Sequence, residues 1–342
     1  MTWDAIKNQP VFIGGHRKCG TTVFTSLLDA HKELFVYPSE TGFFYKFYPV
    51  FLDNKYLEEE KEHRVIESIL RSLDEVVTKW IGKEQLPEYS FDQLVFKFQE
   101  RLNSTVKEPK DYYESVIYAA YCLFSKIKNS NKFWVDKTTS IEIYADVLFD
   151  WYPDAKFIHI LRDPRDNYGS IKSGWDKRYK YQFDSKERLL QSLIDRALLG
   201  MRLAEINHDR YSSRRYLPLR FEDFTSEPGK ELKRVCEFLE IDFSKSMLEP
   251  TFCGSSWGGN NFENKSFSTL SDENVNKWKS RISEHEAKVI EFYFRDLMTK
   301  YNYQLEYSIH EAADAARKHY EWFNYSQPYS IKNNVFYSIN NS

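Results

Sequence analysis

PVFIGGHRKCGTT, residues 10–22, joins a short apolar run to a glycine-containing loop, and TTVFTSLLDAHK (21–32) continues with the apolar spacing of a helix. Strand, glycine turn and helix in this order are typical of a phosphate-binding loop in a parallel α/β protein. Gly15 and Gly20 have the spacing of the nucleoside triphosphate loop G-x-x-x-x-G-K-[ST]. Thr21 occupies the lysine position, however, and Lys18 lies inside the loop. The loop is therefore either a degenerate ATP site or a site for a different phosphate group.

Other apolar runs end in polar turns in the same way. Strands are predicted at residues 10–13, 34–37, 132–135, 155–161 and 214–221. The third run is followed by Asp136 and Lys137, and the fourth by Arg162, Asp163 and Pro164. Repeated strand–turn–helix units predict an α/β fold with a central parallel sheet and flanking helices, and with ligands at the carboxyl ends of the strands.

Helical patterns interrupt this alternation between the first and second site strands. They cover residues 58–81, 91–103 and 111–128, which predicts a helical insertion over about 54–130. Further helices are predicted over 185–207, 229–240, 283–300 and 310–323. We expect a single domain over 1–308, followed by a C-terminal helix and a polar, aromatic tail over 309–342.

The composition narrows the class of partner. The net charge is −3 and the isoelectric point is about 6.3, so no global field attracts nucleic acid. The four cysteines have no metal-ligand spacing, which indicates a reduced protein and predicts no metal site. No run of 18 apolar residues and no signal-peptide pattern occurs. We expect a cytoplasmic protein without a membrane span.

The position of Lys18 suggests a particular chemistry. Backbone N–H groups and the helix N-terminus can bind a phosphate, and a cation inside the loop suits a leaving phosphate oxygen that develops negative charge. The alternative is a solvated loop lysine.

HRKCGTT (16–22) resembles the 5′-phosphosulfate loop, K-x-G-T-T after a strand, of the sulfotransferases that use 3′-phosphoadenylyl sulfate (PAPS). The resemblance implies a fold like that of the P-loop nucleoside triphosphate hydrolases, and it makes Lys18 the catalytic lysine on the bridging oxygen. It assigns these residues to the donor: Arg17, Lys18, Cys19, Gly20, Thr21 and Thr22. Cys19 is either a small space-filling residue or an acidic thiol at a helix N-terminus.

HILRDPRDNYGSIKS (159–173) resembles the 3′-phosphate motif of the same family, R-D-P-x-x-x-x-x-S. Arg162 ends a strand, and Ser170 lies about two turns into the next helix, so both can converge on one anion. The alternatives are a structural pair of Arg162 and Asp163, or a magnesium-binding role for Asp163. SFSTLSDENVNKWKSRIS (266–283) resembles the segment that closes over the donor, where Lys265 and Ser266 would contribute.

Two further stretches resemble the acceptor side of the family. PSETGFF (38–44) is similar to K-E-x-x-F-F of the carbohydrate-type enzymes, which implies that Glu40 is the general base; the alternative is a carboxylate at a helix start. DKTTS (136–140) resembles E-K-[TS]-P, which would bring Lys137 near the sulfuryl group. Asp136 and Thr139 depart from that pattern, and a solvated lysine is the alternative. His16 and His159 lie in the loop and in a buried strand, so neither is a compelling base.

These motifs predict a PAPS-dependent sulfotransferase that forms adenosine 3′,5′-bisphosphate and needs no metal. The base motif favours a sugar or another aliphatic alcohol as the acceptor, either a small molecule or a glycan. Two alternatives are an ATP-dependent small-molecule kinase with a degenerate loop, and a nucleotide-binding module without turnover.

Overall fold

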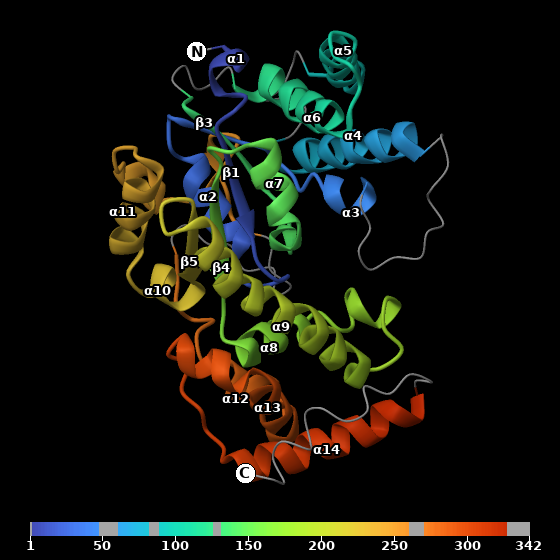
Figure 1. Cartoon of the computed structure of the whole chain (residues 1–342), viewed down its shortest axis with the longest axis vertical. Helices are drawn as coiled ribbons and strands as arrows, with labels where there is room; N and C mark the ends of the chain where they lie inside the picture. The colour runs from blue at the N-terminus through green and yellow to red at the C-terminus, as the bar shows by residue number, and fades with distance from the viewer. Residues whose placement is uncertain (1, 48–60, 82–88, 126–130, 260–269, 327–342) are drawn as a thin grey trace. The chain divides into compact units, whose positions relative to one another are not determined.

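The computed structural model describes residues 2–47, 61–81, 89–125, 131–259 and 270–326 (Figure 1). The chain forms two compact units. The first contains residues 1–162 and 200–274, and the second contains 163–199 and 275–342. The domain division at residue 309 that the sequence suggests stays a prediction.

The first unit is built on a five-stranded parallel sheet, which confirms the predicted fold class. The strands are β1 (Pro10–Gly14), β2 (Leu34–Val36), β3 (Phe133–Lys137), β4 (Lys156–Leu161) and β5 (Tyr216–Arg220), in the order β2-β3-β1-β4-β5. Ile13 pairs with Lys137 on one side and with Ile158 on the other. The turns after β1, β3 and β4 therefore leave the sheet at one edge, as parallel strands require.

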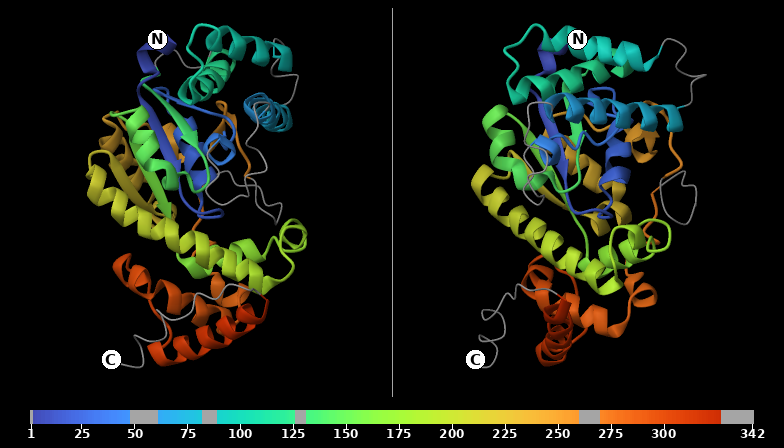
Figure 2. Two further views of the ribbon diagram at one scale, coloured as in Figure 1. Left: turned by 45° about the vertical axis from the view of Figure 1, so that its right-hand side comes forward. Right: turned by 90° about the vertical axis from the view of Figure 1, so that its right-hand side faces the viewer.

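The helical insertion is confirmed as α4 (Lys61–Trp80), α5 (Phe91–Leu102) and α6 (Pro109–Phe124). Ser90 and Gln93 form a capping box that fixes the start of α5. Figures 1 and 2 show the three helices gathered at one end of the first unit. Phe43 and Phe44, on α3 (Phe43–Phe47), are fully buried; Phe43 packs edge-on against Trp151, and Phe44 packs edge-on against Tyr113. The aromatic run after Glu40 thus begins in the core.

The remaining elements of the first unit flank the sheet. They are α1 (Trp3–Ile6), α2 (Thr21–Asp29), the 3₁₀ helix η3 (Ile141–Tyr144), α7 (Ala145–Trp151), α10 (Phe221–Ser226), α11 (Pro228–Leu239), the 3₁₀ helix η5 (Lys245–Leu248) and the short antiparallel strands β6 (Thr251–Phe252) and β7 (Ser255–Ser256). Helix α9 (Lys186–Tyr211) begins in the second unit and ends in the first.

The second unit is helical. Besides the first part of α9 it contains α8 (Pro164–Lys172), the 3₁₀ helix η4 (Tyr179–Tyr181), α12 (Trp278–Arg281), α13 (Glu284–Lys300) and α14 (Ile309–Ser326). Its centre holds Arg165, which is 2% exposed and forms ion pairs with Asp163 at 2.7 Å and Glu291 at 2.6 Å. A buried guanidinium needs such partners, because an unpaired charge there would be very costly. Among the described helices, none is long and apolar enough to cross a membrane.

Candidate active site

The loop between β1 and α2 has a backbone that only its particular residues allow. Gly15 has φ 134°, and a Cβ there would lie 2.4 Å from the carbonyl oxygen of Ile160. Gly20 has φ 96°, and a Cβ there would lie 2.4 Å from the ring of Phe221. Both positions therefore require glycine. Helix α2 starts after Gly20 without a side-chain cap, so its first-turn N–H groups form a site for an anion.

Lys18 is held in the left-handed conformation, with φ 64°. Its carbonyl oxygen accepts a 2.8 Å hydrogen bond from Nη1 of Arg162, whose Nη2 donates to the carbonyl oxygen of Asn274 at 2.8 Å. The guanidinium also lies over the ring of Phe221, 4.3 Å from its centroid. Arg162, 5% exposed, thus connects the turn after β4 to the phosphate loop.

One N–H donor of the Arg162 guanidinium is not used within the described part of the protein. Its Nε is buried and has no hydrogen-bond partner among the residues that the structure describes. A buried donor without a partner is costly unless a ligand completes it, so this atom fits an anionic group. Ser170 lies on α8 in the second unit, and its convergence with Arg162 on one phosphate stays a prediction. Lys265 and Ser266 lie outside the described residues.

Cys19 is 5% exposed, and burial raises the pKa of its thiol well above the usual range. The thiol is therefore protonated at neutral pH, although it lies next to a helix N-terminus. This favours the space-filling interpretation of Cys19 over a reactive one.

A buried carboxyl beneath the loop is a feature that sequence reasoning missed. Glu142, on η3, is 1% exposed, and its Oε2 accepts the N–H of Gly15 at 2.9 Å. A Cβ at Gly14 or Gly200 would lie within 3 Å of its carboxyl oxygens, at 2.6 and 2.9 Å. Burial raises the pKa of Glu142 to about 7. At neutral pH this acid is therefore partly protonated, and the protonated form repels a bound phosphate less than a carboxylate would.

His159 lies next to this carboxyl, with Nε2 3.8 Å from Oε1 of Glu142. Its Nδ1 hydrogen-bonds the hydroxyl of Tyr216 at 2.7 Å. Burial lowers the pKa of His159 to about 3, so the imidazole is neutral near pH 7. Together with its 1% exposure, this supports the view that His159 is structural and not the base.

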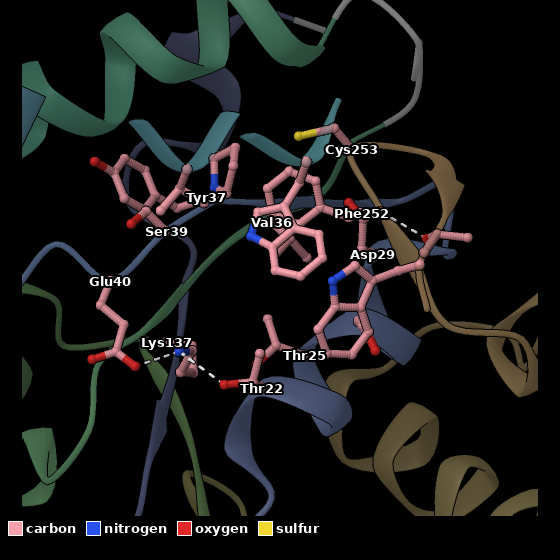
Figure 3. A pocket seen from close by; sticks show the side chains of 16 residues that line it. Thr22, Thr25, Asp29, Val36, Tyr37, Ser39, Glu40, Lys137, Phe252 and Cys253 are labelled. Atoms are coloured by element: carbon pink, nitrogen blue, oxygen red, sulfur yellow. Dashed lines mark hydrogen bonds and ion pairs between the residues drawn. The ribbon is translucent and has the colours of Figure 1, made fainter. Parts of the chain in front are cut away.

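The structure brings Glu40, Lys137 and Thr22 together from three different segments (Figure 3). Nζ of Lys137 donates to Oε1 of Glu40 at 2.5 Å and to Oγ1 of Thr22 at 3.3 Å. Thr139 donates to the same Glu40 oxygen at 3.1 Å. The threonine that departs from the family pattern therefore orients the carboxylate. Lys137 is 7% exposed and paired, so it is not a solvated lysine.

Two opposing effects set the pKa of Glu40. Burial in the site raises this pKa, but the charge of Lys137 and the hydrogen bonds from Lys137 and Thr139 outweigh that effect and lower it below its usual value. Glu40 is therefore ionised near neutral pH. Its side chain keeps 42% of its surface exposed, so an acceptor hydroxyl can reach it.

The buried side chain of Asp136 helps to position the segment that carries Glu40. It is fully buried and accepts hydrogen bonds from Tyr113 at 2.6 Å and from Thr41 at 3.0 Å. Burial raises the pKa of Asp136 to about 6, although these hydrogen bonds oppose the shift. Because Thr41 follows Glu40 directly, this bond limits where Glu40 can lie.

A cavity of about 220 Å³ opens beside Glu40, Lys137 and Thr22. All of its lining residues belong to the first unit. The N-terminus of α2, a lysine–carboxylate pair and a cavity thus meet at the carboxyl edge of the sheet. Such an arrangement can bind an anionic donor and deprotonate a hydroxyl in one place.

A family model described as the sulfotransferase family matches residues 10–245. The chain therefore belongs to the PAPS-dependent sulfotransferase family, and sulfuryl transfer is its class of reaction. No curated protein matches the chain significantly.

Solved structures of sulfotransferases resemble the chain. The sulfotransferase domain from the curacin biosynthetic pathway has a TM-score of 0.50 and 17% identity, over 86% of this chain and 98% of that one. The sulfotransferase domain of the Synechococcus PCC 7002 olefin synthase has a TM-score of 0.49 and 17% identity, over 87% and 96%. A sulfotransferase from Alicyclobacillus acidocaldarius has a TM-score of 0.48 and 14% identity, over 86% and 96%. At 17% identity, the similarity to the curacin domain shows a shared fold and no more.

The buried carboxyl under the loop makes stability depend on pH. The pKa of Glu142 rises from 4.5 in the unfolded chain to about 7 in the fold, so the fold is favoured by protonation. The stabilisation that protonated Glu142 contributes is fully present below pH 4.5 and is lost as the pH rises through 7. The loss is roughly 3 kcal/mol of the free energy of unfolding. We expect Glu142→Gln, which keeps an acceptor for Gly15, to remove this loss in denaturant titrations between pH 4.5 and 8.

Glu237→Gln, on the exposed face of α11, is the matched control and should keep the pH dependence of the wild type. If Glu142→Gln and the wild type lose stability equally with rising pH, Glu142 does not titrate as described.

Proposed function

We propose that this protein transfers the sulfuryl group of PAPS to the hydroxyl of a sugar or another aliphatic alcohol and releases adenosine 3′,5′-bisphosphate. The contact of Lys137 with both Glu40 and Thr22 is the observation that carries the proposal most strongly. It joins a potential base to the first turn of the helix that follows the phosphate loop. Nucleotide binding alone needs no base, so this contact supports an enzyme over a binding module.

Separate residues would serve the two ends of the reaction. The 5′-phosphate would be bound by the N–H groups at the start of α2 and by the hydroxyls of Thr21 and Thr22. The Nε of Arg162, unpaired among the described residues, would donate a hydrogen bond to the 3′-phosphate of the donor. When bound, the donor supplies an activated sulfuryl group. Lys18 would balance the negative charge on the phosphate oxygen as its bond to sulfur breaks.

Glu40 would take the proton of the acceptor hydroxyl as the new oxygen–sulfur bond forms. Its pairing with Lys137 keeps it a weak base while no donor is bound, because the ammonium lowers the pKa of Glu40. The sulfuryl oxygens would compete for Lys137. Once Lys137 turns toward them, burial would dominate and raise the pKa of Glu40, so that the base strengthens when the donor is in place.

The kinase alternative relies on Asp163 as a magnesium ligand. Oδ1 of Asp163 accepts from the backbone N–H of Arg165 at 2.8 Å, and Oδ2 accepts from its Nη2 at 2.7 Å. Both carboxylate oxygens of Asp163 thus accept hydrogen bonds from Arg165, the buried cation of the second unit. Asp163 therefore has a structural role at the start of α8, with Arg165 and not Arg162 as its partner, and this counts against a magnesium site at Asp163.

The function is tested by binding and by turnover together. We expect adenosine 3′,5′-bisphosphate to raise the melting temperature and ATP with Mg²⁺ not to do so. We also expect mass spectrometry to show sulfate added to a member of a pool of alcohols, sugars, sterols and phenols. Lys18→Ala should lower kcat by about 10²–10³, and Lys230→Ala, an exposed lysine on α11, should match the wild type.

Two results would contradict the proposal in different ways. Stabilisation by ATP with Mg²⁺ alone would favour a kinase. Stabilisation by the bisphosphate without sulfate transfer to any acceptor would favour a binding module.

The pairing of Glu40 with Lys137 gives a pH test. The base must be ionised, so kcat/KM falls as the pH drops through the pKa of Glu40 in the free enzyme, and this pKa lies below 4.5. Lys137→Met removes the charge that lowers the pKa and leaves the effect of burial. We expect the acid limb of kcat/KM to move to a higher pH in this variant, whatever its residual rate.

Thr139→Val is the milder comparison, because it removes the hydroxyl that contacts both carboxylate oxygens of Glu40 but keeps the charge of Lys137, so it should move the acid limb less. An acid limb that stays in place in Lys137→Met would show that Glu40 is not the titrating base.

A further inference from the structure

The cavity beside Glu40 has a reacting end and an apolar end. Glu40, Lys137 and Thr22 form the first (Figure 3). At the second, Trp80 of α4 and Trp257 after β7 meet edge-to-face, with centroids 6.3 Å apart and planes at 63°. Val36, Val76 and Phe252 complete this wall. An acceptor whose hydroxyl reaches Glu40 therefore places the rest of its structure against aromatic and aliphatic side chains.

Most of the polar side chains in the described walls are already bonded within the protein, whereas the hydroxyl of Tyr37 has no hydrogen-bond partner among the described residues. Thr25 Oγ1 donates to the carbonyl oxygen of Thr21 at 2.7 Å, and Ser26 Oγ donates to that of Val23 at 2.7 Å. Oδ2 of Asp29 accepts from the hydroxyl of Thr251 at 2.7 Å and from the N–H of Gly254 at 2.9 Å. A polyol with more hydroxyls than the remaining free groups can bond would leave some of them unpaired here, and each unpaired buried group costs about 1–3 kcal/mol.

The wall formed by β6 and β7 is held in a defined position. The two bonds to Asp29 fix both sides of Cys253, which has a left-handed backbone with φ 48°, and they hold Phe252 at the cavity. Asp29 is 5% exposed and lies at the end of α2, the helix that starts at the phosphate loop. One helix thus carries the donor site at its first residue and supports the acceptor wall at its last.

The size of the cavity limits the acceptor further. An apolar cavity of about 150 Å³ accommodates benzene, so about 220 Å³ corresponds to roughly one and a half such rings. Trp80 is 38% exposed, so the apolar wall continues to the surface and gives the ligand additional contact area.

Resting on the proposed function, we propose that the acceptor is a small apolar alcohol with a single hydroxyl and a ring or branched skeleton of about ten carbon atoms or fewer. The apolar skeleton binds at Trp80, Trp257 and Phe252, and the hydroxyl binds at Glu40. Among the alcohols that the proposed function allows, sugars are the poorer acceptors, because the described walls offer few free polar groups to their remaining hydroxyls.

Cyclohexylmethanol and methyl glucopyranoside test this directly. Both present a hydroxymethyl group on a six-membered ring, and they differ mainly in the ring hydroxyls. We expect kcat/KM with PAPS to be about 100-fold higher for cyclohexylmethanol, because an apolar pocket rejects an added hydroxyl by a factor of about 10².

Trp80→Ala should lower kcat/KM for cyclohexylmethanol about 10- to 100-fold through KM, as expected for the loss of a large apolar contact. The stabilisation by adenosine 3′,5′-bisphosphate should not change. Trp322→Ala on α14, a tryptophan of similar exposure in the second unit, is the matched control and should behave as the wild type. Trp80 is partly exposed, so its removal tests binding without emptying the core.

The outcomes separate this inference from the function on which it rests. Equal or better transfer to the glucoside, or no effect of Trp80→Ala, would overturn the acceptor class and leave sulfuryl transfer in place. Failure of the wild type to bind the bisphosphate and to sulfate any acceptor would overturn both.

Discussion

The hydrogen bond from Arg162 to the carbonyl oxygen of Lys18 joins the two strand-end turns on which the whole site depends. One turn presents the N–H groups at the start of α2, and the other ends β4 with a buried cation. The parallel register of β1 and β4 brings these turns to the same edge. The arrangement needs Gly15 and Gly20, because a Cβ at either would collide with its neighbours. An anion site of this kind is therefore prepared by the backbone before any ligand binds.

The second essential contact is the ion pair of Lys137 and Glu40, which lies between the loop and the cavity. It leaves Glu40, the proposed base, ionised but weakly basic, because the charge of Lys137 and the hydrogen bonds to Glu40 outweigh the effect of burial on its pKa. A bound donor that attracted Lys137 away from Glu40 would raise the pKa of Glu40, so the proposed base would become stronger only while the donor is bound. The proposed acceptor site depends on the fold of the first unit, where α4 and the β6–β7 pair supply Trp80 and Phe252 to the cavity.

Much of the fold could be predicted because its signals are local. Short runs of four to eight residues predicted the five parallel strands, and helical spacing predicted the insertion. Glu40 and Lys137 were predicted from separate motifs. Their side chains lie close together because β2 and β3, the strands that precede or contain them, are parallel neighbours whose carboxyl ends lie at the same edge of the sheet. Glu142 could not be predicted, since it contacts Gly15 across 127 positions of the chain and no local pattern marks it. The pairing of Trp80 with Trp257 likewise depends on tertiary packing alone.

The central claim is that the turn after β1 binds the 5′-phosphate of an adenosine 3′,5′-bisphosphate nucleotide. A crystal structure of the protein with that bisphosphate tests it most directly. The account predicts the 5′-phosphate on the backbone N–H groups of residues 19–22, with Arg162 still bonded to the carbonyl oxygen of Lys18. A nucleotide bound elsewhere, with this turn empty, would contradict it.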